Sequence, residues 1–185
     1  YKFHHQRYHP HIQDYLKKFG YYDIFLVDAD TGKVVYTVFK ELDFATSLIN
    51  GPYANTGLGR AFKAAKNSGN GDFVYLDDFE TYAPSYDNPA SFISSPIVNA
   101  KGKMTGVLIF QMPIDNINRV MTSDKEWADV GLGASGETYL VGSDSLMRSQ
   151  SRFLIEDKAG FMAAIQDVKM SGNMRDIIEN KETTI

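Results

Sequence analysis

Carboxylate, hydroxyl and aromatic side chains gather between residues 74 and 98, in the stretch VYLDDFETYAPSYDNPASFISSPIV. Asp77 or Asp78 can pair with the ammonium group of a ligand, and tyrosine and serine hydroxyls can fix the orientation of a small molecule. Aromatic rings around these groups shield a bound molecule from water. The residue types therefore suit a site for a small, partly polar ligand.

Alternation along the expected strands assigns the side chains of this candidate site. If residues 72–77 form a strand, Tyr75 and Asp77 point to one face and Asp78 points to the other. Tyr82 and Ser85, with the proline between them, are expected to fold over the cavity as a lid. The candidate ligand-binding residues are Tyr75, Asp77, Asp78, Tyr82, Ser85, Phe92, Ser94 and Phe110.

A structural role is the alternative for the same side chains. Aromatic residues are more often core than pocket, and Asp77 and Asp78 can cap a turn. No arginine occurs in residues 61–112, so a carboxylate ligand would need Arg60, a nearby lysine or backbone amides. The sequence therefore favours an amine or a neutral ligand over a carboxylate.

All four histidines occur in HHQRYHPH, residues 4–11. On a helix, His5 and His9 stand four residues apart, which is compatible with a metal pair. Pro10 disturbs that geometry, and a solvated helix face or contact with lipid headgroups are the alternatives. We favour the solvated face and expect no metal site.

Catalytic groups are not apparent in the sequence. The serines of SDSLMRSQSR have no histidine after them to act as a base, and the acidic residues form no convincing pair. We therefore expect a binding module with no cofactor, and not an enzyme.

The composition excludes several classes of protein. The 185 residues carry a net charge of −4 without a basic cluster, so nucleic acid is not expected as a partner. Cysteine is absent, which excludes disulfides and thiol catalysis. No apolar run approaches the roughly 20 residues that span a bilayer. Because the sequence starts at Tyr1 without methionine, we expect it to be part of a longer protein.

The elements that must position the site form an α+β fold. Helical spacing of apolar residues predicts a long amphipathic helix over residues 1–19, which Gly20 ends. Because of Pro10, the alternatives are a kink at this residue or a shorter helix that begins near His9. Turn residues at 28–32 join two strands in a hairpin, and both faces of the first of these strands are apolar. Short helices follow within residues 43–68. Strands at 72–77, 90–98 and 104–112 and a helix after Pro113 complete residues 20–122. These elements predict a five-stranded antiparallel sheet with the long helix on one face and short segments on the other.

A second module is indicated after a glycine-rich connection at residues 123–136. GETYLVGSDS repeats the strand-and-turn pattern of YYDIFLVDADTG. The strands needed to close a second sheet are missing, so residues 137–185 are interpreted as a truncated module with a helical stretch near 157–180.

Four stretches together resemble one family. They are YYDIFLVDADTGKVVYTV, FATSLINGPYANTGLGRAFKAA, FETYAPSYDNPASFISSPI and GETYLVGSDSLMRSQSR. In this order they resemble the extracytoplasmic Cache (PAS-like) sensor domains of bacterial methyl-accepting chemotaxis proteins and of related transmembrane kinases and cyclases. The resemblance covers most of residues 20–152.

The resemblance implies a function and a location. It implies the periplasmic, ligand-sensing portion of a homodimeric inner-membrane chemoreceptor, which binds a small molecule in the sheet cavity and passes a conformational signal across the membrane. The arginine and tryptophan pattern of amino-acid-binding Cache domains is not visible in this sequence. The resemblance therefore does not imply an amino-acid ligand. The alternative is an interaction or dimerisation module of the same fold with a plugged cavity.

Overall fold

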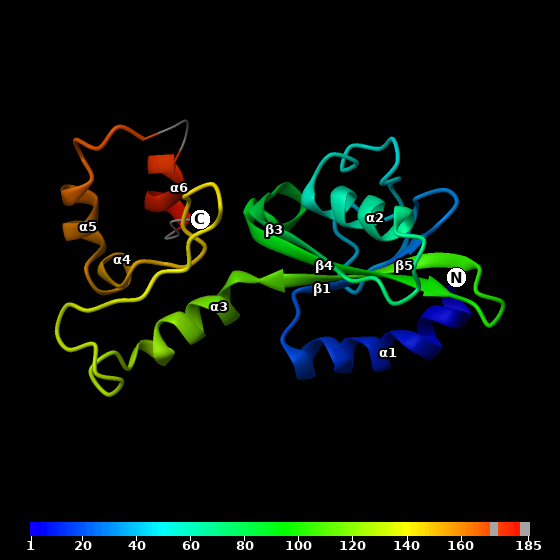
Figure 1. Cartoon of the computed structure of the whole chain (residues 1–185), viewed down its shortest axis with the longest axis horizontal. Helices are drawn as coiled ribbons and strands as arrows, with labels where there is room; N and C mark the ends of the chain where they lie inside the picture. The colour runs from blue at the N-terminus through cyan, green and yellow to red at the C-terminus, as the bar shows by residue number, and fades with distance from the viewer. Residues whose placement is uncertain (171–173, 182–185) are drawn as a thin grey trace. The chain divides into compact units, whose positions relative to one another are not determined.

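A five-stranded antiparallel sheet organises the first 113 residues (Figure 1). The computed structural model describes residues 1–170 and 174–181, and the chain divides into two units, Tyr1–Pro113 and Ile114–Ile185. The strand order is β2-β1-β5-β4-β3. The strands are β1 (Asp23–Asp28), β2 (Val34–Tyr36), β3 (Tyr75–Tyr82), β4 (Asn88–Val98) and β5 (Met104–Pro113).

Helix α1 (Lys2–Phe19) covers one face of the sheet, as the sequence predicts. Its Leu16 packs with Ile24 and Tyr36 from the β1–β2 hairpin. The helix ends at Gly20, whose φ of 71° is a left-handed conformation that glycine adopts without strain. The prediction of a long helix that ends at this glycine is confirmed.

Helix α2 (Gly57–Asn67) covers the opposite face and buries the larger core. Phe62 of this helix is fully buried with Phe25 of β1 and Phe92 of β4. Because neighbouring side chains of a strand point to opposite faces, β1 contributes to both cores: Phe25 and Val27 to this one, Ile24 and Leu26 to the other. The predicted coverage of the sheet on both faces is confirmed.

The segment between β3 and β4 is more regular than the sequence predicts. Instead of ending at residue 77, β3 continues to Tyr82, with a register shift between Asp77 and Glu80. A short 3-10 helix, η1 (Ala83–Ser85), and two residues with positive φ then lead directly into β4. Pairing between β3 and β4 on both sides of the register shift holds these residues in strands, despite the turn-forming residues in the sequence.

The second unit is built from short helices. They are α3 (Ile114–Met121), α4 (Arg152–Glu156), α5 (Lys158–Ala164) and α6 (Met174–Lys181), with a 3-10 helix η2 (Ser123–Lys125) after α3. Where the sequence predicts a strand after residue 137, the described residues show a single isolated bridge between Val141 and Met147. The helical stretch expected near 157–180 contains α5 and α6, and its residues 171–173 lie outside the described part of the chain. A truncated second module stays a prediction.

A search of the described helices finds none with the length and apolar character needed to cross a membrane.

Candidate functional site

Strand register brings four of the predicted site residues together on the α2 face. Tyr75 and Asp77 of β3 lie opposite Ser94 and Phe92 of β4, respectively. All four side chains lie on the face that α2 covers, and Ser94 donates a hydrogen bond to the carbonyl oxygen of Ala61 in that helix at 2.7 Å. The shared face that alternation predicts is therefore confirmed for these residues.

Phe110 lies on the other face, so the structure separates it from Phe92 and Ser94, with which the sequence analysis groups it as a candidate ligand-binding residue. It pairs with Ile24 and Ile93 across the sheet and stacks on Tyr21 with ring centroids 4.5 Å apart, within the core under α1. The residue of β5 that lies opposite Phe92 is Gln111. The sequence-based grouping did not fix the register between β4 and β5, and a shift of one residue exchanges the two faces.

The carboxylate of Asp77 is already fully engaged. Arg60 of α2 donates to both of its oxygens, at 3.0 Å from Nε and 2.6 Å from Nη2, and Tyr75 donates its hydroxyl at 3.2 Å. Glu80 accepts from the same guanidinium group at 2.9 Å and from the amide of Gly57 at 2.6 Å. These acidic partners, Asp77 first, raise the pKa of Arg60. Asp77 therefore fastens α2 to β3.

Asp78 takes the other direction, as alternation predicts. It is exposed and accepts a hydrogen bond from the amide of Phe79 at 2.7 Å. The structure does not bring it together with the other predicted site residues on the α2 face.

Phe92 and the ring of Tyr82 are core residues. Both are fully buried, and their rings meet edge to face at 5.0 Å. A Cβ added at Gly57 would lie 3.0 Å from the Phe92 ring, so the start of α2 lies directly against it. The packing over the middle of β4 is that of a hydrophobic core.

A largely buried polar group lies on this same face, and we call it the acceptor cluster. It combines side chains from β1, β5, the segment after β2 and the segment around η1. Its members are Asp23, Glu41, Asp43, Tyr82, Ser85 and Gln111. Two of these, Tyr82 and Ser85, are among the residues predicted from sequence.

Hydrogen bonds tie the two covering segments to each other and to the sheet. Tyr82 donates its hydroxyl to Asp43 at 2.7 Å, and Ser85 donates to Glu41 at 3.2 Å. Ser85 also accepts from Nε2 of Gln111 at 2.9 Å. The segment around η1 is thus held closed on residues 41–43 by these bonds.

Two buried oxygens of the acceptor cluster have no hydrogen-bond partner in the part of the chain that the structure describes. They are Oδ1 of Asp43 and Oε1 of Gln111, on side chains that are almost completely buried. Both atoms are acceptors, so the group that would satisfy them must carry N–H or O–H donors. Leaving buried acceptors unpaired is unfavourable, by about 1–3 kcal/mol for each group.

The acceptor cluster also has an excess of negative charge. Among the described residues, no lysine or arginine forms an ion pair with Asp23, Glu41 or Asp43. Burial, with smaller contributions from the nearby Asp23 and Glu41, raises the pKa of Asp43 to about 6, although the hydrogen bond from Tyr82 acts in the opposite direction. Burial likewise raises the pKa of Asp23, although Thr37 donates to it at 2.7 Å. A bound cation would offset the unfavourable burial and mutual repulsion of these carboxylates.

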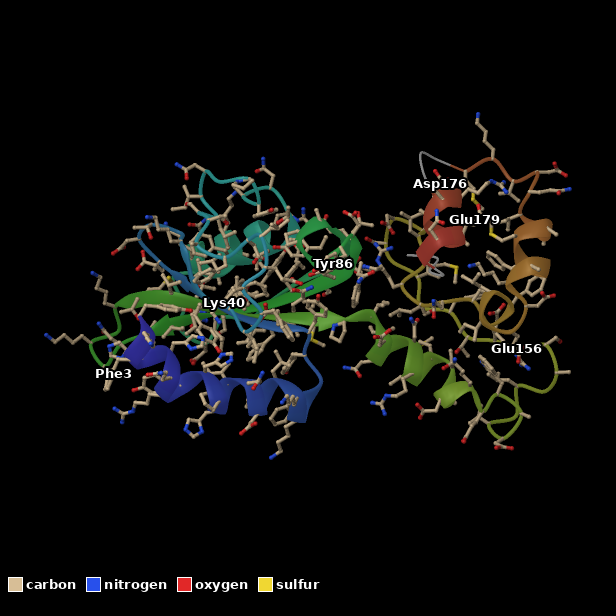
Figure 2. The ribbon with its side chains drawn as sticks, turned by 180° about the vertical axis from the view of Figure 1, so that it is seen from behind. Phe3, Lys40, Tyr86, Glu156, Asp176 and Glu179 are labelled. Atoms are coloured by element: carbon tan, nitrogen blue, oxygen red, sulfur yellow. The ribbon has the colours of Figure 1, made fainter. Side chains whose placement is uncertain are left out.

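Backbone strain is concentrated in the two segments that cover the acceptor cluster. In residues 1–113, all of which the structure describes, the non-glycine residues with positive φ are Lys40, Ala45, Tyr86 and Asp87. Lys40 and Ala45 flank residues 41–43, and the other two directly follow η1. Such conformations cost of order 1 kcal/mol or more and collect at functional sites. Figure 2 labels Lys40 and Tyr86, and the side chain of Tyr86 is 76% exposed.

Sequence reasoning missed four members of the acceptor cluster, namely Asp23, Glu41, Asp43 and Gln111. A signal was present for two of them. Asp23 and Gln111 are polar residues inside otherwise apolar strands, and such residues need a buried partner. The segment with Glu41 and Asp43 has no periodic pattern that would indicate its position.

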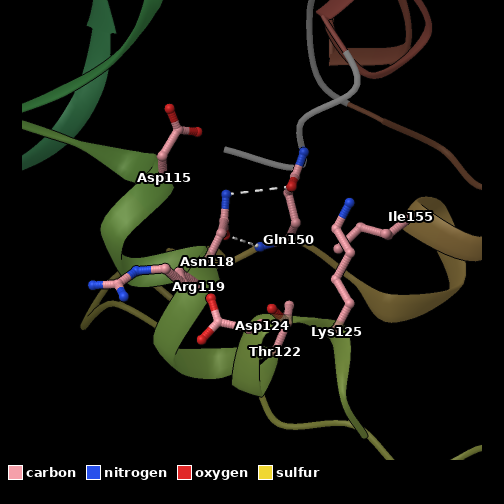
Figure 3. A pocket seen from close by; sticks show the side chains of 8 residues that line it. All are labelled: Asp115, Asn118, Arg119, Thr122, Asp124, Lys125, Gln150 and Ile155. Atoms are coloured by element: carbon pink, nitrogen blue, oxygen red, sulfur yellow. Dashed lines mark hydrogen bonds between the residues drawn. The ribbon is translucent and has the colours of Figure 1, made fainter.

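The second unit contains a polar pocket of about 270 Å³ (Figure 3). Its centre is a reciprocal pair of hydrogen bonds: Asn118 donates to the side chain of Gln150 at 3.3 Å and accepts from its backbone amide at 2.8 Å. The charged residues around it are of both signs, Asp115, Arg119, Asp124 and Lys125. Within the described residues, no group of three or more histidine, aspartate or glutamate side chains could hold a metal ion.

The four histidines do not share one solvated face. His4 and His11 are exposed, but His5 and His9 are only partly so, and their rings stack at 4.3 Å. His9 also shares a hydrogen bond of 2.8 Å between its Nδ1 and the hydroxyl of Tyr36. The expectation of a solvated face is therefore wrong for these two.

Comparison with solved structures identifies the fold. The ligand-binding domain of the Pseudomonas aeruginosa amino acid chemoreceptor PctC, in complex with GABA, superposes with a TM-score of 0.50 at 15% identity, over 73% of this chain. The corresponding domain of the Campylobacter jejuni chemoreceptor Tlp3, in complex with 4-methylisoleucine, gives 0.50 at 14% identity, over 76% of this chain.

The chain has the fold of a chemoreceptor sensor domain. At the level of the fold, this confirms the resemblance to Cache domains that the sequence shows. The chain spans about half of each solved structure, 52% of the first and 48% of the second. No protein-family model matches the sequence, and no curated protein does.

Proposed function

We propose that residues 1–113 form the ligand-sensing module of a bacterial transmembrane receptor, on the periplasmic side of the inner membrane. The ligand is a small molecule with an ammonium group, and it binds at the acceptor cluster. The observation that carries this proposal is the pair of buried, unpartnered acceptors, Oδ1 of Asp43 and Oε1 of Gln111.

An ammonium group fits the acceptor cluster in both hydrogen bonding and charge. It has three donors, enough for the two open acceptors and one further oxygen, and it would balance the charge of carboxylates that have no cationic partner. A carboxylate ligand would add negative charge beside Asp23, Glu41 and Asp43. GABA and 4-methylisoleucine, which are named with the two similar structures, carry an amino group and a carboxylate, and only the amino group matches the acceptor cluster.

The segment around η1 is the proposed lid. Its Ser85 and Tyr82 bond to Glu41 and Asp43, so a ligand that bonds to the open oxygen of Asp43 acts on the carboxylate that holds the segment and would shift it. A signal needs only a few kcal/mol of preference for one of two conformations. In the proposed receptor, which is a homodimer, this shift passes through α1 or the second unit toward the membrane.

A thermal-shift screen tests the proposal. The panel contains ethanolamine, putrescine and GABA, with acetate, succinate and glucose as ligands without an ammonium group. We expect a dose-dependent rise in Tm for at least one amine, because a ligand that binds only the native state stabilises it. Asp43→Asn should remove the rise. Asp30→Asn, at an exposed turn position, is the matched control and should keep it. A rise that appears only with the other ligands contradicts the proposal.

An interaction module with a plugged cavity is the second candidate. It is favoured by the close packing of Phe92 and Tyr82 under α2. In that case none of the ligands raises the Tm, and the receptor responds to a protein partner or to its own dimerisation. The same screen therefore separates the two candidates.

A further inference from the structure

The sequence contains two Asn–Gly pairs, Asn50–Gly51 and Asn70–Gly71. In such a pair the backbone nitrogen of the glycine can attack the amide carbon of the asparagine side chain. The two groups are held close within one chain, and glycine has no Cβ to obstruct the approach. Both asparagines are exposed, so water is available at either place. The hydrogen bonds around the two pairs differ, however.

The attacking nitrogen is restrained in the first pair. The amide of Gly51 donates to the carbonyl oxygen of Ser47 at 2.8 Å, and the amide of Ile49 donates to the hydroxyl of the same serine at 3.2 Å. A Cβ on Gly51 would collide with that carbonyl oxygen, so the turn is tight at this residue. To reach the side chain of Asn50, the nitrogen of Gly51 must give up its hydrogen bond and leave the turn.

The attacking nitrogen is unrestrained in the second pair. Within the described part of the chain, the amide of Gly71 forms no hydrogen bond. The side chain of Asn70 is held through its Oδ1, which accepts from the amide of Asp72 at 3.0 Å. A donor on this oxygen polarises the amide carbon and stabilises the negative charge that the oxygen acquires on attack. The second pair therefore combines an accessible nucleophile with a polarised carbonyl group.

We propose that Asn70 is a site of spontaneous modification, at which the folded chain loses ammonia. The nitrogen of Gly71 forms a bond to Cγ of Asn70, the bond from Cγ to Nδ2 breaks, and the amide proton leaves with Nδ2 as ammonia. Water then opens the cyclic imide at one of its two carbonyl groups and leaves a carboxylate. The product is an aspartate or an isoaspartate at position 70, whereas Asn50 reacts more slowly.

The modification changes the charge and the backbone of the turn that precedes β3. It adds a negative charge beside Asp72. An isoaspartate also lengthens the backbone by one methylene group, at a residue whose carbonyl oxygen accepts from the amide of Phe73 at 3.2 Å. No residue of the acceptor cluster lies in this turn, so the proposal is independent of amine binding.

Mass spectrometry of the whole folded chain, incubated at neutral pH in isotopically labelled water, tests the proposal. The label marks each site that reacted before digestion, because the new carboxylate takes one oxygen from the solvent. We expect Asn70 to be modified about fivefold faster than Asn50, or more, the effect of one retained hydrogen bond. In urea both turns are lost, and the two pairs should then react at similar rates.

Gly71→Ala is the matched variant, because it places a methyl group beside the attacking nitrogen. Its Cβ would lie 3.3 Å from a methyl group of Val98, a partly exposed side chain that can move aside. The variant should slow the reaction at Asn70 and leave the rate at Asn50 unchanged. Circular dichroism checks that the fold is kept.

Three results would overturn the proposal. Asn50 reacts as fast as Asn70 in the folded chain, Gly71→Ala leaves the rate at Asn70 unchanged, or the difference between the two pairs persists in urea. The last result would assign the difference to the flanking sequence and not to the hydrogen bonds. None of these results bears on the acceptor cluster, which the Asp43 variant tests separately.

Discussion

Asp77 and Asp43 are two buried aspartates on the same side of one sheet, in opposite states. Asp77 has a bidentate arginine and a tyrosine hydroxyl, so both of its oxygens are occupied. Asp43 accepts a hydrogen bond from one tyrosine hydroxyl on one of its oxygens. Among the described residues it has no cationic partner, and its other oxygen accepts no hydrogen bond. Asp77, one of the two carboxylates that the sequence offers for a ligand, is the satisfied one.

The contrast shows how to tell a structural carboxylate from a binding one. A buried charge that the protein itself neutralises stabilises the fold and has little left to offer a ligand. A buried charge that the protein leaves incompletely bonded is costly in the free state, and a ligand can recover that cost on binding. Chain elements around the two residues differ accordingly: α2 packs tightly over Asp77, and segments with backbone strain cover Asp43.

The largest expected effect is on the core beside Asp77. Phe92→Ala should lower the free energy of unfolding by about 3–5 kcal/mol, because a fully buried ring is replaced by a cavity. Urea denaturation measures the change. A loss below about 1 kcal/mol would mean that Phe92 lines an open space, and the α2 face would then need to be reconsidered as the ligand site.

The next effect is the pH dependence that Asp43 adds. Its pKa is about 6 in the folded state and 3.8 in the unfolded state, so the folded state binds the proton more tightly. The stability that the folded state gains by binding this proton is fully present below pH 4 and is lost as the pH rises through 6. It amounts to about 3 kcal/mol. The gain in stability from Asp43→Asn should therefore be larger at pH 7 than at pH 4. Denaturation curves at the two pH values measure it, and an equal gain at both would contradict the raised pKa.

Asp77→Asn should cost about 2 kcal/mol of stability, since it removes a bidentate, charge-assisted pair with an arginine that is partly solvated. Glu80→Gln, which touches the same guanidinium group from a more exposed position, is the control and should cost less than about 1 kcal/mol. Thermal or urea denaturation compares the two. Equal losses would argue against a special role for Asp77 in fastening α2.

Tyr82→Phe is expected to have the smallest effect on stability, about 1 kcal/mol, because the ring and its packing remain and only the hydroxyl bond to Asp43 is lost. Amine affinity should fall as well, since Asp43 loses the group that orients it. Calorimetric titration of the variant measures this. Unchanged affinity would remove Tyr82 from the site.

Much of the fold could be predicted from the sequence. The periodic pattern over residues 1–19, the Asp and Gly turn of the first hairpin and the two apolar faces of β1 are local features, and the structure confirms them. The extent of β3 was not predictable in the same way, because pairing with β4 on both sides of a register shift holds it.

The candidate site was predictable only in part. Tyr82 and Ser85 lie in the stretch that the sequence marks out, and both belong to the acceptor cluster. Asp43 comes from a segment 39 residues before Tyr82, in a region without a periodic pattern, and only tertiary structure brings the two together. The saturation of Asp77 by Arg60 depends on how α2 packs, which the sequence does not specify.

The measurement that tests the account most directly is a calorimetric titration of wild type, Asp43→Asn and Asp77→Asn with the amine that gives the largest thermal shift. It is made at a temperature where all three are folded. We predict that affinity falls about tenfold or more in Asp43→Asn, through loss of a buried charged acceptor, and stays within about twofold in Asp77→Asn. The reverse result, with affinity lost in Asp77→Asn and kept in Asp43→Asn, would contradict the assignment of the ligand site to the acceptor cluster.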